Sequence, residues 1–161
     1  MDAPVCRPAR PEEMDEVYLM GYDAWGAGDG ADAYLAACAA SPKYATGRWL
    51  VLEDGGILLS SLIVYDLGGP AAGLGSIATA PERRGHGHAS RLTAAAAGAI
   101  EGAGKSRIFL FSDIEPAFYE RLGFRALPAR FQRKPGSCCM VRTDDLGALV
   151  REPGFEPPEY F

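Results

Sequence analysis

The sequence predicts an α+β fold whose strands form a mixed sheet. Segments with helical and strand-like apolar spacing alternate along the chain, and a tight Asp54-Gly55-Gly56 turn joins two strand-like runs. Residues 108–111 (Ile-Phe-Leu-Phe) are apolar throughout, which is typical of a strand buried on both faces and favours parallel pairing through a helical crossover. The expected element order is therefore β-α-α-β-β-β-α-β-α-β-β.

The N-terminal part is expected to be helical after a short extended start at residues 5–7. Pro11 opens the first helix, because proline and the acidic residues that follow it are favoured in a first turn. One apolar helical face continues to Trp25. Asp29 or Asp32 is then expected to cap a second, alanine-rich helix that ends near Ala40.

The rest of the chain alternates between strands and helices. Strands are expected over residues 48–53, 57–66 and about 72–79, and residues 88–102 form the clearest helix. A short helix over residues 116–122 ends at Gly123, the residue type favoured after a helix C-terminus. Short strands follow at 124–127 and 137–141. The sequence thus predicts one domain over residues 1–143 and a proline-rich C-terminal tail over residues 144–161.

The composition is that of an ordinary globular chain. Its 161 residues are 48% hydrophobic and 23% charged, and 16 basic against 21 acidic side chains give a net charge of −5. Such a chain lacks the basic surface that binding of a phosphate backbone requires, so nucleic acid is not an expected partner. No apolar stretch approaches the roughly 20 residues that span a bilayer, and the first residues lack a secretory signal. A cytoplasmic protein with no membrane partner is expected.

The cysteines are expected to be free thiols. No Cys-x-x-Cys pair occurs among Cys6, Cys38, Cys138 and Cys139, and the adjacent two would point to opposite faces of a strand. A disulfide framework would have to involve Cys6 and Cys38, and a chain of this length does not need one. Free cysteines are usually buried.

The most informative segment is the loop before the helix expected at residues 88–102. Gly85 and Gly87 let the backbone turn tightly, so several N–H groups can converge at the positive end of that helix. This arrangement suits a phosphate or pyrophosphate, and Arg83 and Arg84 add cations. A P-loop is excluded because no Gly-Lys-Ser/Thr is present, and the dinucleotide fingerprint is excluded because Ser90 replaces its last glycine. A plain turn is the alternative interpretation.

Two motifs lie on either side of the strand expected at residues 108–111. They read Arg84-Gly85-His86-Gly87-His88-Ala89 and Ala117-Phe118-Tyr119-Glu120-Arg121-Leu122-Gly123-Phe124. The first resembles the Arg/Gln-x-x-Gly-x-Gly/Ala signature of the GNAT superfamily of acyl-CoA-dependent N-acyltransferases, and the second resembles that family's Tyr-x-x-x-Gly-Phe element. The resemblance extends over about residues 5–141. It implies a mixed, mostly antiparallel central sheet flanked by helices, with a splayed strand pair that holds CoA.

The resemblance also implies a binding site for acetyl-CoA as the acyl donor. Backbone groups of Ile77 and Thr79 would pair with pantetheine, with a bulge at Gly75, and the loop amides would hold the pyrophosphate. The implied cofactor-binding residues are Ile77, Ala78, Thr79, Arg83, Arg84, Gly85, His86, Gly87, His88, Ala89 and Ser112. No metal is expected, because a histidine pair two residues apart without another clustered ligand is poor zinc spacing.

Tyr119 aligns with the tyrosine that protonates the departing CoA thiolate in many family members. A phenol can supply that proton, and the alternative is that Tyr119 is a core aromatic. The family's glutamate is missing, because residues 71–77 contain no carboxylate. The remaining candidates for a base are Asp113, Glu115, Glu53 and Asp66, of which Asp113 would also suit a helix cap. Water or an already neutral amine would serve as well.

The implied reaction is transfer of an acetyl group from acetyl-CoA to a primary amine by direct attack in a ternary complex. The amine would belong to a small molecule or a lysine-like peptide side chain, and backbone near Thr79 would polarise the thioester carbonyl. The first two helices would build the acceptor pocket, lined by Tyr22, Trp25, Asp29 and Tyr34, unless these aromatics are core. Two rivals stay open, a non-catalytic CoA-binding sensor or subunit and a domain that binds no CoA. A homodimer is compatible with the sequence.

Overall fold

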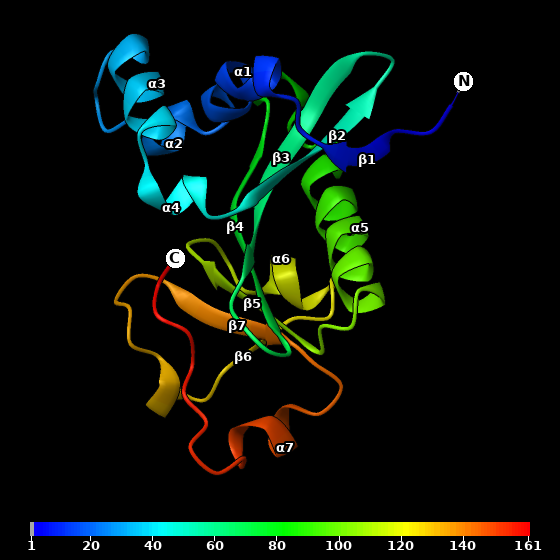
Figure 1. Cartoon of the computed structure of the whole chain (residues 1–161), viewed down its shortest axis with the longest axis vertical. Coiled ribbons are helices and arrows are strands. Elements are labelled where there is room, and N and C mark those ends of the chain that lie inside the picture. Colours follow the sequence, from blue (N-terminus) through cyan, green and yellow to red (C-terminus); the bar gives the residue numbers. More distant parts are fainter. Residues whose placement is uncertain (1) are drawn as a thin grey trace. The chain divides into compact units, whose positions relative to one another are not determined.

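Seven strands form one mixed sheet, as the sequence predicts. The computed structural model describes residues 2–161, and the strands follow the order β1-β2-β3-β4-β5-β7-β6 (Figure 1). β4 and β5 pair in parallel, whereas the other registered pairs, β1/β2, β2/β3, β5/β7 and β6/β7, are antiparallel. The strand bounds are β1 Val5–Pro8, β2 Arg48–Asp54, β3 Ile57–Asp66, β4 Ala71–Thr79, β5 Arg107–Ser112, β6 Arg125–Ala126 and β7 Cys138–Arg142.

The described residues divide into two compact units. The first comprises residues 2–65 and Ser76–Ala96, and the second comprises Asp66–Gly75 and Ala97–Phe161. Strand β4 and helix α5 (His88–Gly102) each pass along the chain from one unit into the other.

The N-terminal helices of the first unit are shorter than expected. The segment predicted as one helix forms a 3-10 turn, η1 (Pro11–Glu13), and two helices, α1 (Met14–Leu19) and α2 (Tyr22–Trp25), which lie beside α3 in Figure 1. The prediction of a single long helix in this segment is therefore wrong. The break falls at Gly21, where a Cβ would lie 2.0 Å from the ring of Trp25. The ring of Trp25, one helical turn further on, packs against the bare glycine backbone.

The next two helices also differ from the sequence prediction. Helix α3 (Ala31–Ala39) begins after Gly30 without a side-chain cap. The prediction that Asp29 or Asp32 caps this helix is therefore wrong. Helix α4 (Pro42–Ala45) was not expected, and Ser41 caps it by accepting from the Tyr44 N–H at 3.3 Å. The core of the first unit contains Val17, Met20, Val51, Leu58 and Ala80.

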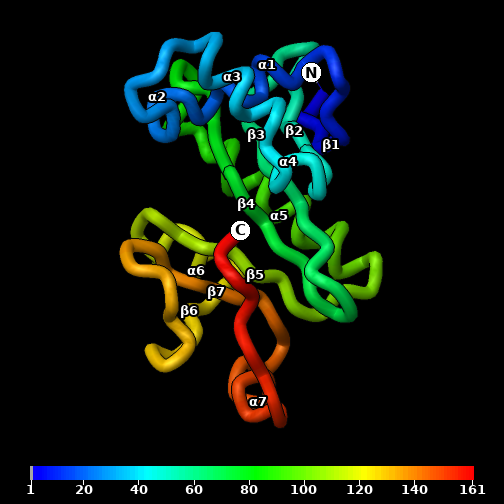
Figure 2. Tube along the Cα trace, turned by 60° about the vertical axis from the view of Figure 1, so that its left-hand side comes forward, coloured from blue at the N-terminus to red at the C-terminus, as the bar shows by residue number. Residues whose placement is uncertain are grey.

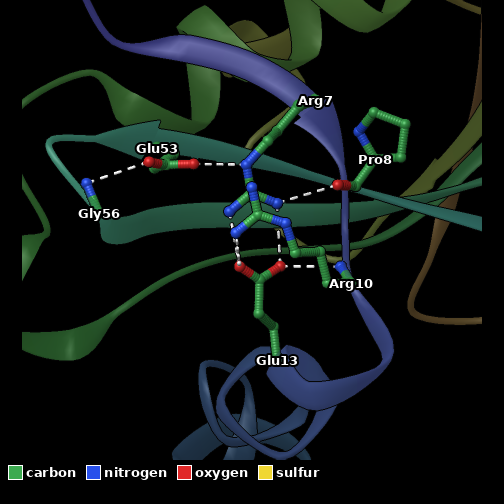
Figure 3. Close-up of polar contacts among 6 residues, drawn as sticks. All are labelled: Arg7, Pro8, Arg10, Glu13, Glu53 and Gly56. Carbon is green, nitrogen blue, oxygen red and sulfur yellow. Dashed lines mark hydrogen bonds and ion pairs between the residues drawn. The ribbon is translucent and has the colours of Figure 1, made fainter.

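An arginine bound to two carboxylates connects β1 to η1 and β2 in the first unit (Figure 3). Arg7 donates from its two Nη atoms to Glu13 at 2.9 and 2.6 Å, and from Nε to Glu53. The Arg10 N–H also donates to Glu13 at 2.8 Å, and the Gly56 N–H donates to Glu53 at 3.0 Å. The hydrogen bonds from Arg7 hold the pKa of Glu13 down at about 2. This Arg7 cluster therefore stabilises the ionised form of Glu13 in the folded chain.

The second unit is built around the parallel pair that the apolar run at 108–111 predicts. Ala71–Leu74 of β4 register with Arg107–Leu110 of β5, and β7 pairs with the other edge of β5. Its short helices are α6 (Ala117–Glu120) and α7 (Leu146–Val150), with the 3-10 turn η3 (Ala129–Phe131). Gly123 follows α6 with a φ of +87°, as expected of a helix C-terminus. The core contains Phe109, Leu127, Cys139, Val141 and Leu149.

The C-terminal residues pack within the second unit rather than extending freely from it. Helix α7, which was not expected, is capped by Asp145, whose side chain accepts from the Ala148 N–H at 2.9 Å. From α7 the chain returns toward β5 (Figure 2), where the ring of Phe161 lies 5.2 Å from that of Phe111. A Cβ on Gly73 would lie 2.6 Å from the Phe161 ring, so the missing side chain of β4 makes room for this contact.

The cysteine prediction is confirmed. All four cysteines are free, Cys38 and Cys139 are buried, and Cys6 and Cys138 are partly buried. Burial raises the pKa of each of these thiols. Across residues 2–161, no helix combines the length and apolar character needed to cross a membrane.

Candidate active site

The end of β4 has an irregular backbone, close to where the sequence predicts a bulge. The irregular residue is Ser76, with a φ of +46°, rather than its neighbour Gly75. The Ser76 hydroxyl lies 3.1 Å from the hydroxyl of Tyr44 in α4. A residue other than glycine at positive φ costs energy and needs support from its surroundings. The contact with Tyr44 supplies such support immediately before Ile77.

Two side chains fix the last residues of β4. Ser60 of β3, which is buried, donates to the carbonyl of Ala78 at 2.6 Å, and its Oγ lies 3.2 Å from Oγ1 of Thr79. The carbonyl of Thr79 accepts from Nε of Arg84 at 3.1 Å. A carbonyl oxygen has a second lone pair, so this bond leaves Thr79 able to accept once more. The predicted pantetheine-binding residues Ile77, Ala78 and Thr79 are half-buried.

The loop after β4 has the geometry that its glycines predict. After the 3-10 turn η2 (Pro81–Arg83), Gly85 and Gly87 have φ values of +84° and +78°, and a Cβ at either would meet nothing within 4 Å. Backbone conformation, not crowding, therefore makes glycine the favoured residue here. The loop leads into the first turn of α5, a helix of 15 residues whose first N–H groups have no partner within the helix. His86 is exposed, and His88 and Ala89 are half-buried.

The two arginines of this loop differ in what they bind. Arg84 donates from Nη1 and Nη2 to the two carboxylate oxygens of Asp23 in α2, at 2.6 and 2.8 Å, and from Nη2 to the carbonyl of Met20 at 3.2 Å. These hydrogen bonds lower the pKa of Asp23 below its ordinary value. Arg83 has a single ion pair in the described chain, with its neighbour Glu82 at 2.5 Å. Asp23 is a residue that the sequence analysis missed, because its partner lies 61 positions away.

The two histidines show no arrangement for a metal. The rings of His86 and His88 lie 5.9 Å apart at an interplanar angle of 41°. Within residues 2–161, no three His, Cys, Asp or Glu side chains gather as a metal site would require.

The remaining predicted residues, Ser112 and Tyr119, lie in the second unit. Ser112 is buried at the end of β5, where its Oγ donates to the Ile114 carbonyl at 2.9 Å and accepts from the Ile114 N–H at 3.3 Å. The hydroxyl thus closes the turn after β5. The same turn contains Asp113, which does not cap α6, because that helix begins after Pro116 without a side-chain cap.

Tyr119 is 8% exposed and packs between two phenylalanines. The rings of Phe118 and Phe124 lie 4.9 and 6.2 Å from its ring, both edge to face. Burial, and then the nearby charge of Asp113, raise the pKa of Tyr119 to about 12. The ring is therefore packed in the interior of the second unit, and the phenol keeps its proton at neutral pH.

Two of the four carboxylates considered as a base are already bound to cations. Glu53 belongs to the Arg7 cluster, and Asp66 accepts from the Gly68 N–H at 2.8 Å and from Lys105 at 3.0 Å. These contacts lower the pKa of both carboxyls, which weakens them as bases. Asp113 and Glu115 in the second unit are the candidates that stay open.

The aromatic residues expected around an acceptor pocket contact one another. The rings of Tyr22 and Tyr34 lie 5.1 Å apart, and Tyr22 donates to the carbonyl of Asp29. Tyr34 donates to the Tyr18 carbonyl at 3.1 Å, whereas Trp25 is exposed. A second aromatic group, which the sequence analysis missed, consists of Tyr18, Tyr44 and Trp49, with neighbouring ring centroids 5.0 to 5.9 Å apart.

Comparison with known proteins agrees with the two motifs. The family model of the acetyltransferase (GNAT) domain matches residues 5–127. No curated protein matches the sequence significantly. Among solved structures, a GNAT family acetyltransferase from Brucella melitensis in complex with acetyl-CoA aligns with a TM-score of 0.62 and 22% identity, over 85% of this chain and 86% of that chain.

Two further structures have the same fold at lower identity. The PaiA N-acetyltransferase from Thermoplasma acidophilum, in complex with coenzyme A, aligns with a TM-score of 0.66 and 14% identity over 88% of this chain and 99% of that one. A chimera of the Vibrio cholerae spermidine N-acetyltransferase SpeG and hSSAT aligns with a TM-score of 0.67 and 17% identity, over 88% and 96% of the two chains.

Proposed function

Because the chain belongs to the GNAT acetyltransferase family, we propose that it transfers an acetyl group from acetyl-CoA to a primary amine in a ternary complex. The observation that carries this proposal is the loop between β4 and α5. Gly85 and Gly87, both at positive φ, lead into the first turn of a 15-residue helix, whose first N–H groups have no partner within the helix, and such a terminus is a favourable environment for a pyrophosphate. Complexes of two structural neighbours with acetyl-CoA and coenzyme A support the choice of donor.

The proposed chemistry is direct attack on the thioester. The amine nitrogen forms a bond to the carbonyl carbon, the carbon–sulfur bond breaks, and the sulfur leaves as CoA thiolate. Tyr119 donates its phenolic proton to that thiolate, and its raised pKa means that the phenol is protonated before the step. The amine loses its proton to water or to a carboxylate such as Asp113 or Glu115. The acceptor is a small-molecule amine or a lysine-like side chain, and spermidine is a first candidate to assay because one neighbour is a spermidine N-acetyltransferase chimera.

Calorimetric titration with acetyl-CoA tests the donor site. Gly87→Glu should reduce the affinity at least tenfold, because it strains a residue at a φ of +78° and adds a negative charge beside the expected pyrophosphate. Gly104→Glu is the matched control, since Gly104 also has a positive φ of +94° but follows the C-terminal end of α5. Absence of binding by the folded wild type would refute the proposal.

Steady-state measurement of CoA release, with spermidine and lysine-like amines as acceptors, tests whether Tyr119 is the general acid. Tyr119→Phe keeps the packed ring and removes the proton, so kcat should fall by about 100-fold with little change in acetyl-CoA affinity. An unchanged kcat would exclude Tyr119 as the acid.

A non-catalytic CoA-binding sensor is the second candidate function. The absence of a carboxylate from β4 favours it, because Ala71–Thr79 contains no residue that could serve as a base. Tight acetyl-CoA binding without turnover for any amine would select this alternative.

A further inference from the structure

Arg84 uses most of its hydrogen-bonding capacity inside the first unit. A guanidinium has five N–H donors. Four hydrogen bonds from Arg84 go to three segments: Nε to the Thr79 carbonyl, one Nη2 bond to the Met20 carbonyl, and one bond from each Nη to the Asp23 carboxylate. One N–H is left for any other partner.

The partners of Arg84 lie at structurally sensitive places. Met20 is the C-terminal cap of α1, whose last carbonyls lack helical partners, and Arg84 satisfies one of them. Thr79 is the last residue of β4, and Asp23 is in α2. One side chain therefore connects the end of β4, the α1–α2 junction and the glycine loop that begins at Gly85.

We propose that Arg84 and Asp23 form a positioning pair that holds the loop of residues 84–87 in its donor-binding conformation, rather than Arg84 acting as the cation that binds the donor's phosphates. This inference rests on the proposed function. The Arg84–Asp23 pair is neutral overall, so the attraction for an anion comes mainly from the N–H groups at the start of α5. Asp23 thereby becomes a functional residue although it carries the same sign of charge as the substrate.

Asp23→Asn distinguishes the two roles because they predict opposite signs. If Arg84 bound phosphate, removing the competing carboxylate would free it and remove a negative charge, so acetyl-CoA affinity would rise. If the pair positions the loop, the affinity should fall by roughly fivefold, since one arm of the bidentate bond is lost. Asp23→Glu, which keeps the carboxylate, should retain most of the wild-type affinity.

Glu82→Gln is the matched control. It also removes a carboxylate from an arginine of the same loop, but the Glu82–Arg83 pair connects no other segment. Its acetyl-CoA affinity should equal or exceed that of the wild type. A general effect of removing negative charge near the loop would change both variants in the same direction.

Calorimetric titration of all four proteins with acetyl-CoA, with melting temperatures as a check on folding, gives a decisive result. Weaker binding by Asp23→Asn alone, at nearly unchanged melting temperature, supports the proposal. Equal or tighter binding by Asp23→Asn overturns it while the acetyltransferase function stands. Failure of the wild type to bind overturns the proposed function itself, so the two failures are distinguishable.

Discussion

The first unit contains two arginine–carboxylate pairs with the same bidentate geometry in different surroundings. Arg7 and Glu13 pair between β1 and η1, with side chains 18% and 15% exposed, and Arg84 and Asp23 pair between the loop and α2, with side chains 45% and 48% exposed. Solvent screens the second pair much more than the first. The comparison suggests that the sheltered pair stabilises the fold, whereas the hydrated pair mainly sets the position of a loop.

Breaking the sheltered pair should have the largest effect on stability. Glu13→Gln leaves the partly buried guanidinium of Arg7 with weaker partners, and the free energy of unfolding should fall by about 1–3 kcal/mol. Urea unfolding measures the change. Arg10→Ala is the control, because that side chain is 60% exposed and lies 3.7 Å from Glu13, so its loss should be nearly neutral. Equal stability of Glu13→Gln and wild type would contradict the role assigned to the Arg7 cluster.

The Arg7–Glu13 pair should also make the free energy of unfolding depend on pH. The pKa of Glu13 is about 2 in the folded chain against an ordinary 4.5, so the unfolded chain binds more protons between these values. The stabilisation is complete above about pH 4.5 and is lost as the pH falls toward 2. Unfolding free energies at about pH 6 and about pH 3 should therefore differ more for the wild type than for Glu13→Gln. Parallel acid profiles of the two proteins would count against this linkage.

Local sequence signals predicted the elements that depend on local chemistry. The helix His88–Gly102 and the strand Ile57–Asp66 were predicted with their observed bounds, because glycines and a tight turn mark their ends. The break at Gly21 was missed because the apolar helical spacing continues across this glycine to Trp25. Helix α7 was missed because the prolines after it suggested a tail.

In the candidate site, too, features that depend on local sequence could be predicted, whereas contacts between distant residues could not. The loop glycines could be predicted, since positive φ is a property of the backbone at those residues. The pairing of Arg84 with Asp23 could not be predicted, because the two residues are 61 positions apart and no spacing rule connects them. Tyr44 was missed for the same reason, since its contact with Ser76 spans 32 positions.

The smallest expected effect on stability concerns the hydrated pair. Asp23→Asn should shift the melting temperature by about 1–2 °C at low salt, and by less near 1 M salt, where exposed charges are screened within about 3 Å. The shift for Glu13→Gln should persist at high salt, because water reaches the Arg7 pair less. Thermal unfolding of both variants and the wild type at two salt concentrations measures these shifts in melting temperature. If Asp23→Asn lost as much stability as Glu13→Gln, the Arg84 pair would be a structural contact of the first unit, and weaker acetyl-CoA binding by that variant would reflect a loosened fold rather than a misplaced loop.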